Sequence, residues 1–227
     1  MSRGGNGFTD TSFSFFDDLA ANNEREWFHA HKQTFEDYVR TPFIEFLEEL
    51  GARLTDSPLP VRGGAQTMFR INRDVRFTDD KRPYSENVSG LLTEGGTKSE
   101  SGRLLYLELH ADGGRIGGGM HQAKASELRP VRELIVAEPG RVEELLAALS
   151  EAEVEFDRSN QVATMPRGFS DADESPHAEL LRCTQLIAMR PLPKSCWLDD
   201  TASDRAVEAA ERLALLYDFI NDARSRH

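Results

Sequence analysis

Apolar residues recur every three or four positions through most of the first quarter of the chain. Stripes of this kind cover residues 13–20, 27–39 and 43–54. A spacing of three and four is typical of amphipathic helices that pack one face against a core. We therefore predict a helical region over residues 8–56.

The stripe is interrupted at Asn22-Asn23, where the sequence favours a helix boundary. Asn23 is followed three positions later by Glu26, which matches a helix N-cap paired with an acidic residue in the first turn. We therefore expect the second helix to start at Asn23.

The pattern changes to period two in the middle of the chain, which is typical of strands. Residues 69–77 alternate between an apolar face and a polar face, and 104–110 and 115–120 read as two further strands joined by a turn. Residues 85–102 are polar and glycine-rich, and we predict a long loop there. These strands predict an antiparallel sheet of at least three strands over residues 66–120.

Helical spacing returns after the predicted sheet. Residues 124–225 are mostly helical in pattern, with short extended pieces near 154–156 and 186–189. Helices followed by a sheet and then by helices indicate an α+β fold. We expect a single domain over residues 1–227, with N-terminal and C-terminal helices flanking the antiparallel sheet.

Composition narrows the class of protein. The 227 residues carry a formal net charge of −12, which argues against general nucleic-acid binding. No apolar run is long enough to cross a bilayer, and residues 1–10 do not resemble a signal peptide, so we expect a cytoplasmic protein without membrane contact. Cys183 and Cys196 have no partner motif, and no metal site is predicted.

The most specific feature is a cluster of cations in this acidic chain. Residues 70–82 contain five basic side chains together with three aspartates: Arg70, Arg73, Arg76, Lys81, Arg82, Asp74, Asp79 and Asp80. Arginine forks bind phosphate or carboxylate groups at two points, but arginine also forms structural ion-pair networks. The cluster is therefore either an anion site or a network that fixes a loop.

Strand alternation assigns separate roles within this cluster. It places Arg70, Asp74 and Arg76 on the polar face, where Arg70 and Arg76 would bind the anion and Asp74 would act as a base. Lys81 and Tyr84 follow on the next turn, Lys81 as a further anion ligand and Tyr84 as a catalytic or orienting group. Arg73 falls on the apolar face, which predicts a structural ion pair.

The second predicted strand adds a further polar face. It presents Tyr106, Glu108 and His110 on the side opposite to its leucines. If this strand lies beside residues 69–77, Glu108 is a candidate catalytic acid or base, and Tyr106 and His110 are candidate ligand contacts. A solvated sheet face is the alternative. Gly117-Gly118-Gly119 lacks a phosphate-loop pattern and indicates a bulge or a close backbone approach.

The segment Arg70-x-x-Arg73-Asp74-x-Arg76-Phe77-x-x-Asp80-Lys81-x-x-Tyr84 resembles the signature of the family catalogued as domain of unknown function 2461. Residues 22–28, 106–119, 166–169 and 177–182 are similar to other parts of that family. The resemblance implies one conserved type of domain and does not imply a particular chemistry or cofactor.

Three hypotheses follow from the sequence. The first is a site for a phosphate-bearing or carboxylate-bearing small molecule, with or without a catalytic reaction. The second is a binding module for an acidic partner or a nucleic-acid backbone. The third is a purely structural ion-pair motif. The sequence identifies no cofactor and no oligomeric state.

Overall fold

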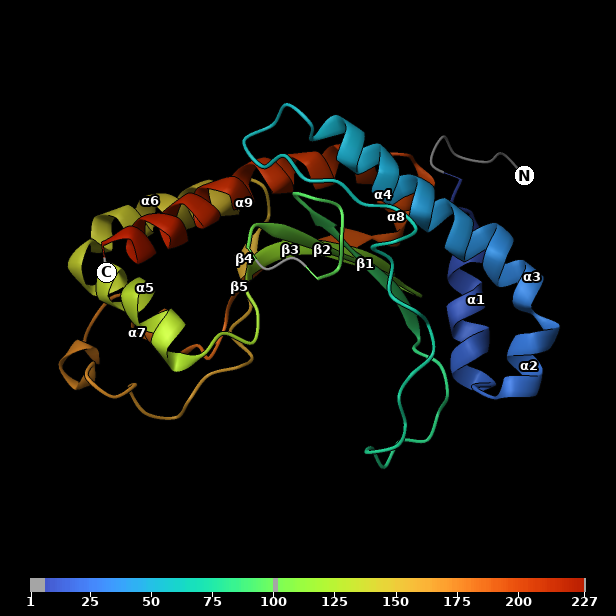
Figure 1. Ribbon diagram of the computed structural model, residues 1–227, viewed down its shortest axis with the longest axis horizontal. Coiled ribbons are helices and arrows are strands. Elements are labelled where there is room, and N and C mark those ends of the chain that lie inside the picture. The colour runs from blue at the N-terminus through green and yellow to red at the C-terminus, as the bar shows by residue number, and fades with distance from the viewer. Residues whose placement is uncertain (1–6, 100–101, 227) are drawn as a thin grey trace. The chain divides into compact units, whose positions relative to one another are not determined.

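The computed structural model describes residues 7–99 and 102–226 and has an α+β fold (Figure 1). Its described residues form an antiparallel sheet with the strand order β1-β2-β3-β5-β4. The strands are β1 (Asn87–Thr93), β2 (Leu104–His110), β3 (Gly113–Met120), β4 (Glu155–Phe156) and β5 (Leu186–Pro193). The predicted fold class, with at least three antiparallel strands and helices at both ends of the chain, is confirmed.

The chain divides into two compact units. The first comprises residues 1–116 and 191–207, and the second comprises residues 117–190 and 208–227. Strands β3 and β5 and helix α9 (Ala202–Ser225) contribute residues to both units.

The first unit contains the predicted N-terminal helical region. Its helices are α1 (Asp10–Ala21), α2 (Arg25–Ala30), α3 (Lys32–Phe35), the π-helical turn η1 (Glu36–Arg40), α4 (Thr41–Arg53) and α8 (Lys194–Leu198). Helix α4 packs against β1 (Figure 1). The core centres on aromatic rings, with the Trp197 ring centroid 4.9 Å from Phe8 and 4.7 Å from Phe46.

The second unit is mostly helical. Its helices are α5 (Ala125–Ala137), α6 (Pro139–Ser150), the 3-10 turn η2 (Ser170–Ala172) and α7 (Ala178–Arg182). The glycine-rich part of β3 lies here, and a Cβ at Gly117 or Gly119 would collide with the carbonyl of Ala188 or Leu186. The close backbone approach expected for these glycines is therefore confirmed, and its partner is β5.

The long loop predicted over residues 85–102 is wrong, because β1 occupies residues 87–93. β1 pairs with β2 from Asn87 opposite His110 to Thr93 opposite Leu104. Gly90 made this strand look like a turn. A Cβ at Gly90 would lie 2.8 Å from Leu47 Cδ1 of α4, so a larger residue here would have to displace that side chain.

The regular strand predicted over residues 69–77 is also wrong. Met68 forms an isolated bridge with Gly90, and Asn72 forms another with Tyr84. The segment therefore leaves β1 and doubles back on itself as a projecting excursion, residues 72–84, which we call the arm (Figure 1). Phe77 falls on the apolar face of the predicted strand, but the residue is 91% exposed, with the Arg76 guanidinium 5.5 Å from its ring centroid.

The predicted N-cap at Asn23 is a third correction. Helix α2 begins at Arg25 with Glu24 as its N-cap, and Asn23 makes no capping bond. Instead, the buried Asn23 side chain binds the backbone of Tyr84: its Nδ2 donates to the Tyr84 carbonyl, and its Oδ1 accepts from the Tyr84 N–H, both at 3.1 Å. A long-range contact has replaced the local one.

Candidate functional site

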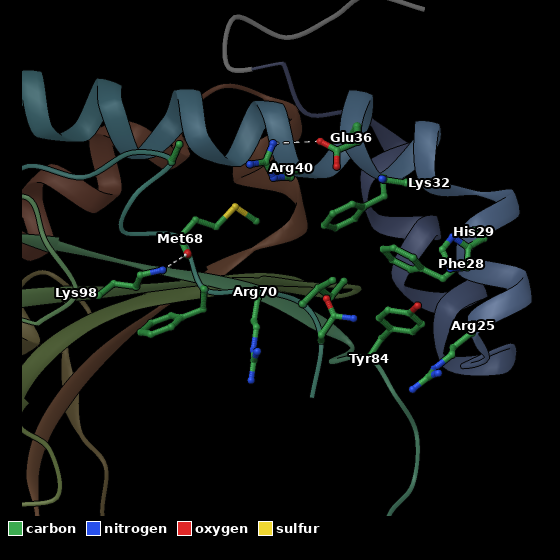
Figure 2. Close-up of a pocket in the computed structure, with 15 residues that line it drawn as sticks. Arg25, Phe28, His29, Lys32, Glu36, Arg40, Met68, Arg70, Tyr84 and Lys98 are labelled. Carbon is green, nitrogen blue, oxygen red and sulfur yellow. Dashed lines mark hydrogen bonds and ion pairs between the residues drawn. The ribbon is translucent and has the colours of Figure 1, made fainter. Parts of the chain in front are cut away.

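A groove of about 630 Å³ opens in the first unit between the helices α2, α3 and η1 and the extended segment that precedes the arm (Figure 2). This volume is in the range of small-molecule sites. The described residues that line it are Arg25, Phe28, His29, Lys32, Phe35, Glu36, Arg40, Ala65, Met68, Phe69, Arg70, Ile71, Asn72, Tyr84 and Lys98.

The helical wall and the base of the arm are held together at Tyr84. The Tyr84 ring stacks on Phe28 of α2, with a centroid distance of 4.1 Å and an interplanar angle of 18°. Asn23 fixes the Tyr84 backbone from the turn before α2. Because both contacts are buried, they set the position of α2 against the arm.

The opposite wall is held by backbone pairing with β1. The Phe69 N–H donates to the Ser89 carbonyl at 2.8 Å, and the Leu91 N–H donates to the Thr67 carbonyl at 3.2 Å. Lys98 adds a link from beyond β1, since its Nζ donates to the Met68 carbonyl at 2.9 Å. The backbone that carries Arg70 is therefore fixed on both sides.

The groove is strongly cationic. Among its described lining residues are Arg25, Lys32, Arg40, Arg70 and Lys98, with one carboxylate, Glu36. Glu36 forms an ion pair with Arg40, whose Nη1 lies 3.1 Å from the Glu36 Oε2. Within the described part of the chain, Arg25, Lys32 and Arg70 are exposed and form no ion pair or side-chain hydrogen bond. The groove thus holds more cations than carboxylates. The charge of Arg70 also reaches Asp74 outside the lining, whose pKa is lowered first by the bonds from Arg76 and then by Arg70.

The cations of the arm behave differently, because they pair with neighbouring acids. Arg73 binds Asp80 at 2.7 Å, and its side chain is only 27% exposed. Arg82 also binds Asp80 at 2.7 Å and forms a second ion pair with Glu86. These bonds, above all those from Arg82, lower the pKa of the Asp80 carboxyl.

The remaining arm residues named from the sequence are also engaged. Arg76 grips Asp74 with its Nε at 2.9 Å from one carboxylate oxygen and its Nη2 at 2.6 Å from the other. The bonds from Arg76 lower the pKa of Asp74, which makes Asp74 a weaker base. Lys81 donates to the Val75 carbonyl at 3.0 Å. None of these three lines the groove, as far as the described residues go.

Strand β2 and its neighbour β3 form a separate polar cluster outside the groove. The Tyr106 hydroxyl donates to Glu108 at 2.6 Å, and Arg115 donates to the same carboxylate oxygen at 3.1 Å. Burial, and then the bond to Glu108, raise the pKa of Tyr106 to about 12. His110 accepts a bond from the Asp112 N–H at 3.2 Å.

Of the residues named from the sequence, the structure brings Arg70 and Tyr84 into the groove and leaves the others elsewhere. Arg25, His29, Lys32 and Lys98 were missed. A signal for the first three was present, since positions 25, 29 and 32 follow the i, i+4, i+7 spacing of one helix face. No such pattern includes Lys98. Its position at the groove depends on β1, which lies in the segment predicted as a loop.

Comparison with protein families decides what this chain is related to. The model of the family described as conserved hypothetical protein (DUF2461) matches residues 11–219. The chain belongs to this family. The match includes both the arm and the groove of this DUF2461 member, so the resemblance drawn from residues 70–84 is confirmed at the level of the family.

Other comparisons set limits. No curated protein matches the chain. Within the described residues, no helix combines the length and the apolar character that a membrane crossing requires. Nor do histidine, cysteine and carboxylate side chains of the described part gather into a group that could hold a metal ion.

Proposed function

We propose that this DUF2461 member binds an anionic ligand in the groove, through phosphate or carboxylate groups that contact Arg25, Lys32 and Arg70. The observation that supports this most directly is the contrast in pairing. The arginines of the arm pair with adjacent carboxylates, whereas the three exposed groove cations pair with none among the described residues. The chain has a net charge of −12, so acidic residues are plentiful, yet none of those described forms an ion pair with these three cations.

The arm takes the structural role in this proposal. Arg73, Asp80 and Arg82 form a linked set of ion pairs across its two limbs. Such pairs hold a local shape and leave little donor capacity for a ligand. Asp74 and Glu108 were candidate catalytic groups, but each is bound to an arginine, so the proposed function is binding without an assigned reaction.

The test is ligand-induced stabilisation of the folded chain. A panel of inorganic phosphate, nucleotides, phosphorylated sugars and dicarboxylates should contain members that raise the melting temperature, because a ligand of the native state adds to apparent stability. Arg70→Ala should weaken the binding of such a member by roughly tenfold to a hundredfold, since a hydrogen bond to a charged group contributes about 1.5–3 kcal/mol.

Arg76→Ala is the matched control. Arg76 is an exposed arginine only six positions away, but it pairs with Asp74 and lies outside the groove. Its loss should lower the affinity much less than Arg70→Ala does, because it removes no group of the groove and only frees the Asp74 carboxylate, which interacts with Arg70. Equal loss of binding in both variants would place the site on the arm. If no member of the panel raised the melting temperature, the proposal would be wrong.

A further inference from the structure

The backbone along one wall of the groove bends at Ile71 and has an edge that is open at residues 70 and 72. Thr67 and Phe69 bond to β1, Arg73 bonds to Pro83 on the returning limb of the arm, and Ile71 bonds to Ser85 just after the arm. In an extended chain, successive backbone groups point to opposite edges. Residues 70 and 72 therefore direct their N–H and C=O groups away from these partners.

These outward groups are unused. Within the described residues, neither Arg70 nor Asn72 forms a backbone hydrogen bond, and both residues are exposed and line the groove. The edge is short, because the next outward residue, Met68, is already occupied: its N–H donates to Gly64, and its carbonyl accepts from Lys98.

An open edge of this kind is suited to pairing with another extended chain. Charge determines which chain. Arg70 extends from the edge itself, Arg25 extends toward the same side from α2, and Lys98 lies at the opposite end of the groove (Figure 2). A peptide rich in Asp or Glu would meet these cations, whereas a basic peptide would be repelled.

We propose that the ligand of the groove is an extended acidic peptide segment that adds as a strand alongside Arg70 and Asn72. This inference rests on the proposed function of the same groove and specifies its ligand. Side chains of a bound strand alternate in direction. One set would lie over the apolar floor formed by Phe28, Met68 and Ile71, and the carboxylates of the other set would reach the cations.

A peptide explains two features together that a small anion explains only in part. The cations suit any phosphate or carboxylate, whereas the outward N–H and C=O groups at residues 70 and 72 together match the alternating acceptors and donors of a second backbone. Glutamate side chains on alternate residues of a strand recur at about twice the 3.3 Å rise. They can therefore meet cations distributed along the groove.

The experiment compares two synthetic peptides of equal charge by calorimetry on the full chain. One alternates glutamate and valine. The other has the same sequence with N-methyl groups on alternate residues, which remove the N–H donors of one edge. The unmodified peptide should bind. The methylated peptide should bind at least about tenfold more weakly, as expected for the loss of one or two backbone hydrogen bonds.

A variant of the protein tests the same kind of hydrogen bond by removing a donor of the groove instead of a donor of the peptide. Asn72→Pro removes one outward N–H and keeps every cation, and proline is tolerated on a strand edge that faces solvent. It should weaken the peptide about tenfold and leave the affinity for inorganic phosphate or a dicarboxylate unchanged. Hydrogen exchange at Arg70 and Asn72 should slow when the peptide binds to the unaltered chain.

The possible outcomes separate the two proposals. If small anions bind but the peptide binds no better than its methylated form, strand addition is wrong and the anion groove stands. If neither small anions nor the peptide bind, both proposals fall. If a nucleic-acid strand binds and the acidic peptide does not, the groove prefers anionic partners, but an acidic peptide is the wrong one.

Discussion

Pairing with neighbours separates residues that look identical in the sequence. Arg70 and Arg76 both lie on the polar face that strand alternation predicts, and both were expected to bind a ligand. The structure binds Arg76 to Asp74 and leaves Arg70 exposed in the groove. Sequence alone could not make this distinction, because Asp74 lies on the same predicted face as both arginines, and only the folded backbone decides which of them it pairs with.

The cluster of Tyr106, Glu108 and Arg115 gives a prediction at the scale of single residues. The pKa of Tyr106 is raised from 10.0 to about 12. Because the folded state holds this proton more tightly than the unfolded chain, the contribution to stability is complete below pH 10 and is lost between about pH 10 and 12. The ultraviolet absorbance of tyrosinate should include a late ionisation step from Tyr106.

Tyr106→Phe is the control for this titration. The late step should disappear, while the ionisation of the other tyrosines should be unchanged. Glu108→Gln should move the step to lower pH, because the carboxylate beside the hydroxyl opposes formation of a second negative charge. A late step that persists in Tyr106→Phe would assign it to another tyrosine.

At the scale of elements, periodicity predicts the helices and strands whose apolar face packs against the core. The helical region over 8–56, the strands over 104–110 and 115–120, and the mostly helical stretch over 124–225 are predicted and present. Periodicity failed at β1 and at the arm, where the outcome depends on distant residues. The strand that contains Gly90 pairs with β2 and packs against α4. The arm is closed by the bridge between Asn72 and Tyr84, and the Tyr84 backbone is held by the distant Asn23.

Asn23 gives a prediction at this scale, since it links two elements. Asn23→Ala should lower the free energy of unfolding by about 1–3 kcal/mol, because it leaves the buried N–H and C=O of Tyr84 without their partner. Denaturant titration measures this loss. The affinity for anions should fall as well, because Tyr84 and α2 would no longer hold one wall in place.

Asn22→Ala is the adjacent control. The Asn22 side chain is exposed and bonds only to the Asp18 carbonyl of its own helix among the described residues. A surface change of this kind usually alters stability by less than about 0.5 kcal/mol. If the two variants proved equally stable, the contact between Asn23 and Tyr84 would not be what fixes the groove.

At the scale of the whole molecule, a cationic groove lies in a chain of net charge −12. The general charge repels anions at long range, and the groove attracts them at short range. Salt screens exposed charges over about 8 Å at physiological ionic strength. We therefore expect added salt to speed the association of an anionic ligand and also to speed its dissociation.

Stopped-flow measurements at several salt concentrations test this expectation. The association rate should rise with salt, which is the reverse of ordinary attraction between opposite charges. Arg70→Ala should reduce the salt dependence of dissociation and leave that of association nearly unchanged. An association rate that falls with salt would show that the local field of the groove dominates from the first encounter.

The exposed edge at Arg70 and Asn72 has a consequence for self-association. An unpaired edge invites a second copy of the same chain to add its own edge, which is a common route to aggregation. Here the edge is flanked by Arg25, Lys32 and Arg70, and an antiparallel pair of copies would bring these like charges together. We expect the repulsion between these cations to oppose such pairing of two copies. Replacing them with neutral residues should increase the tendency to aggregate.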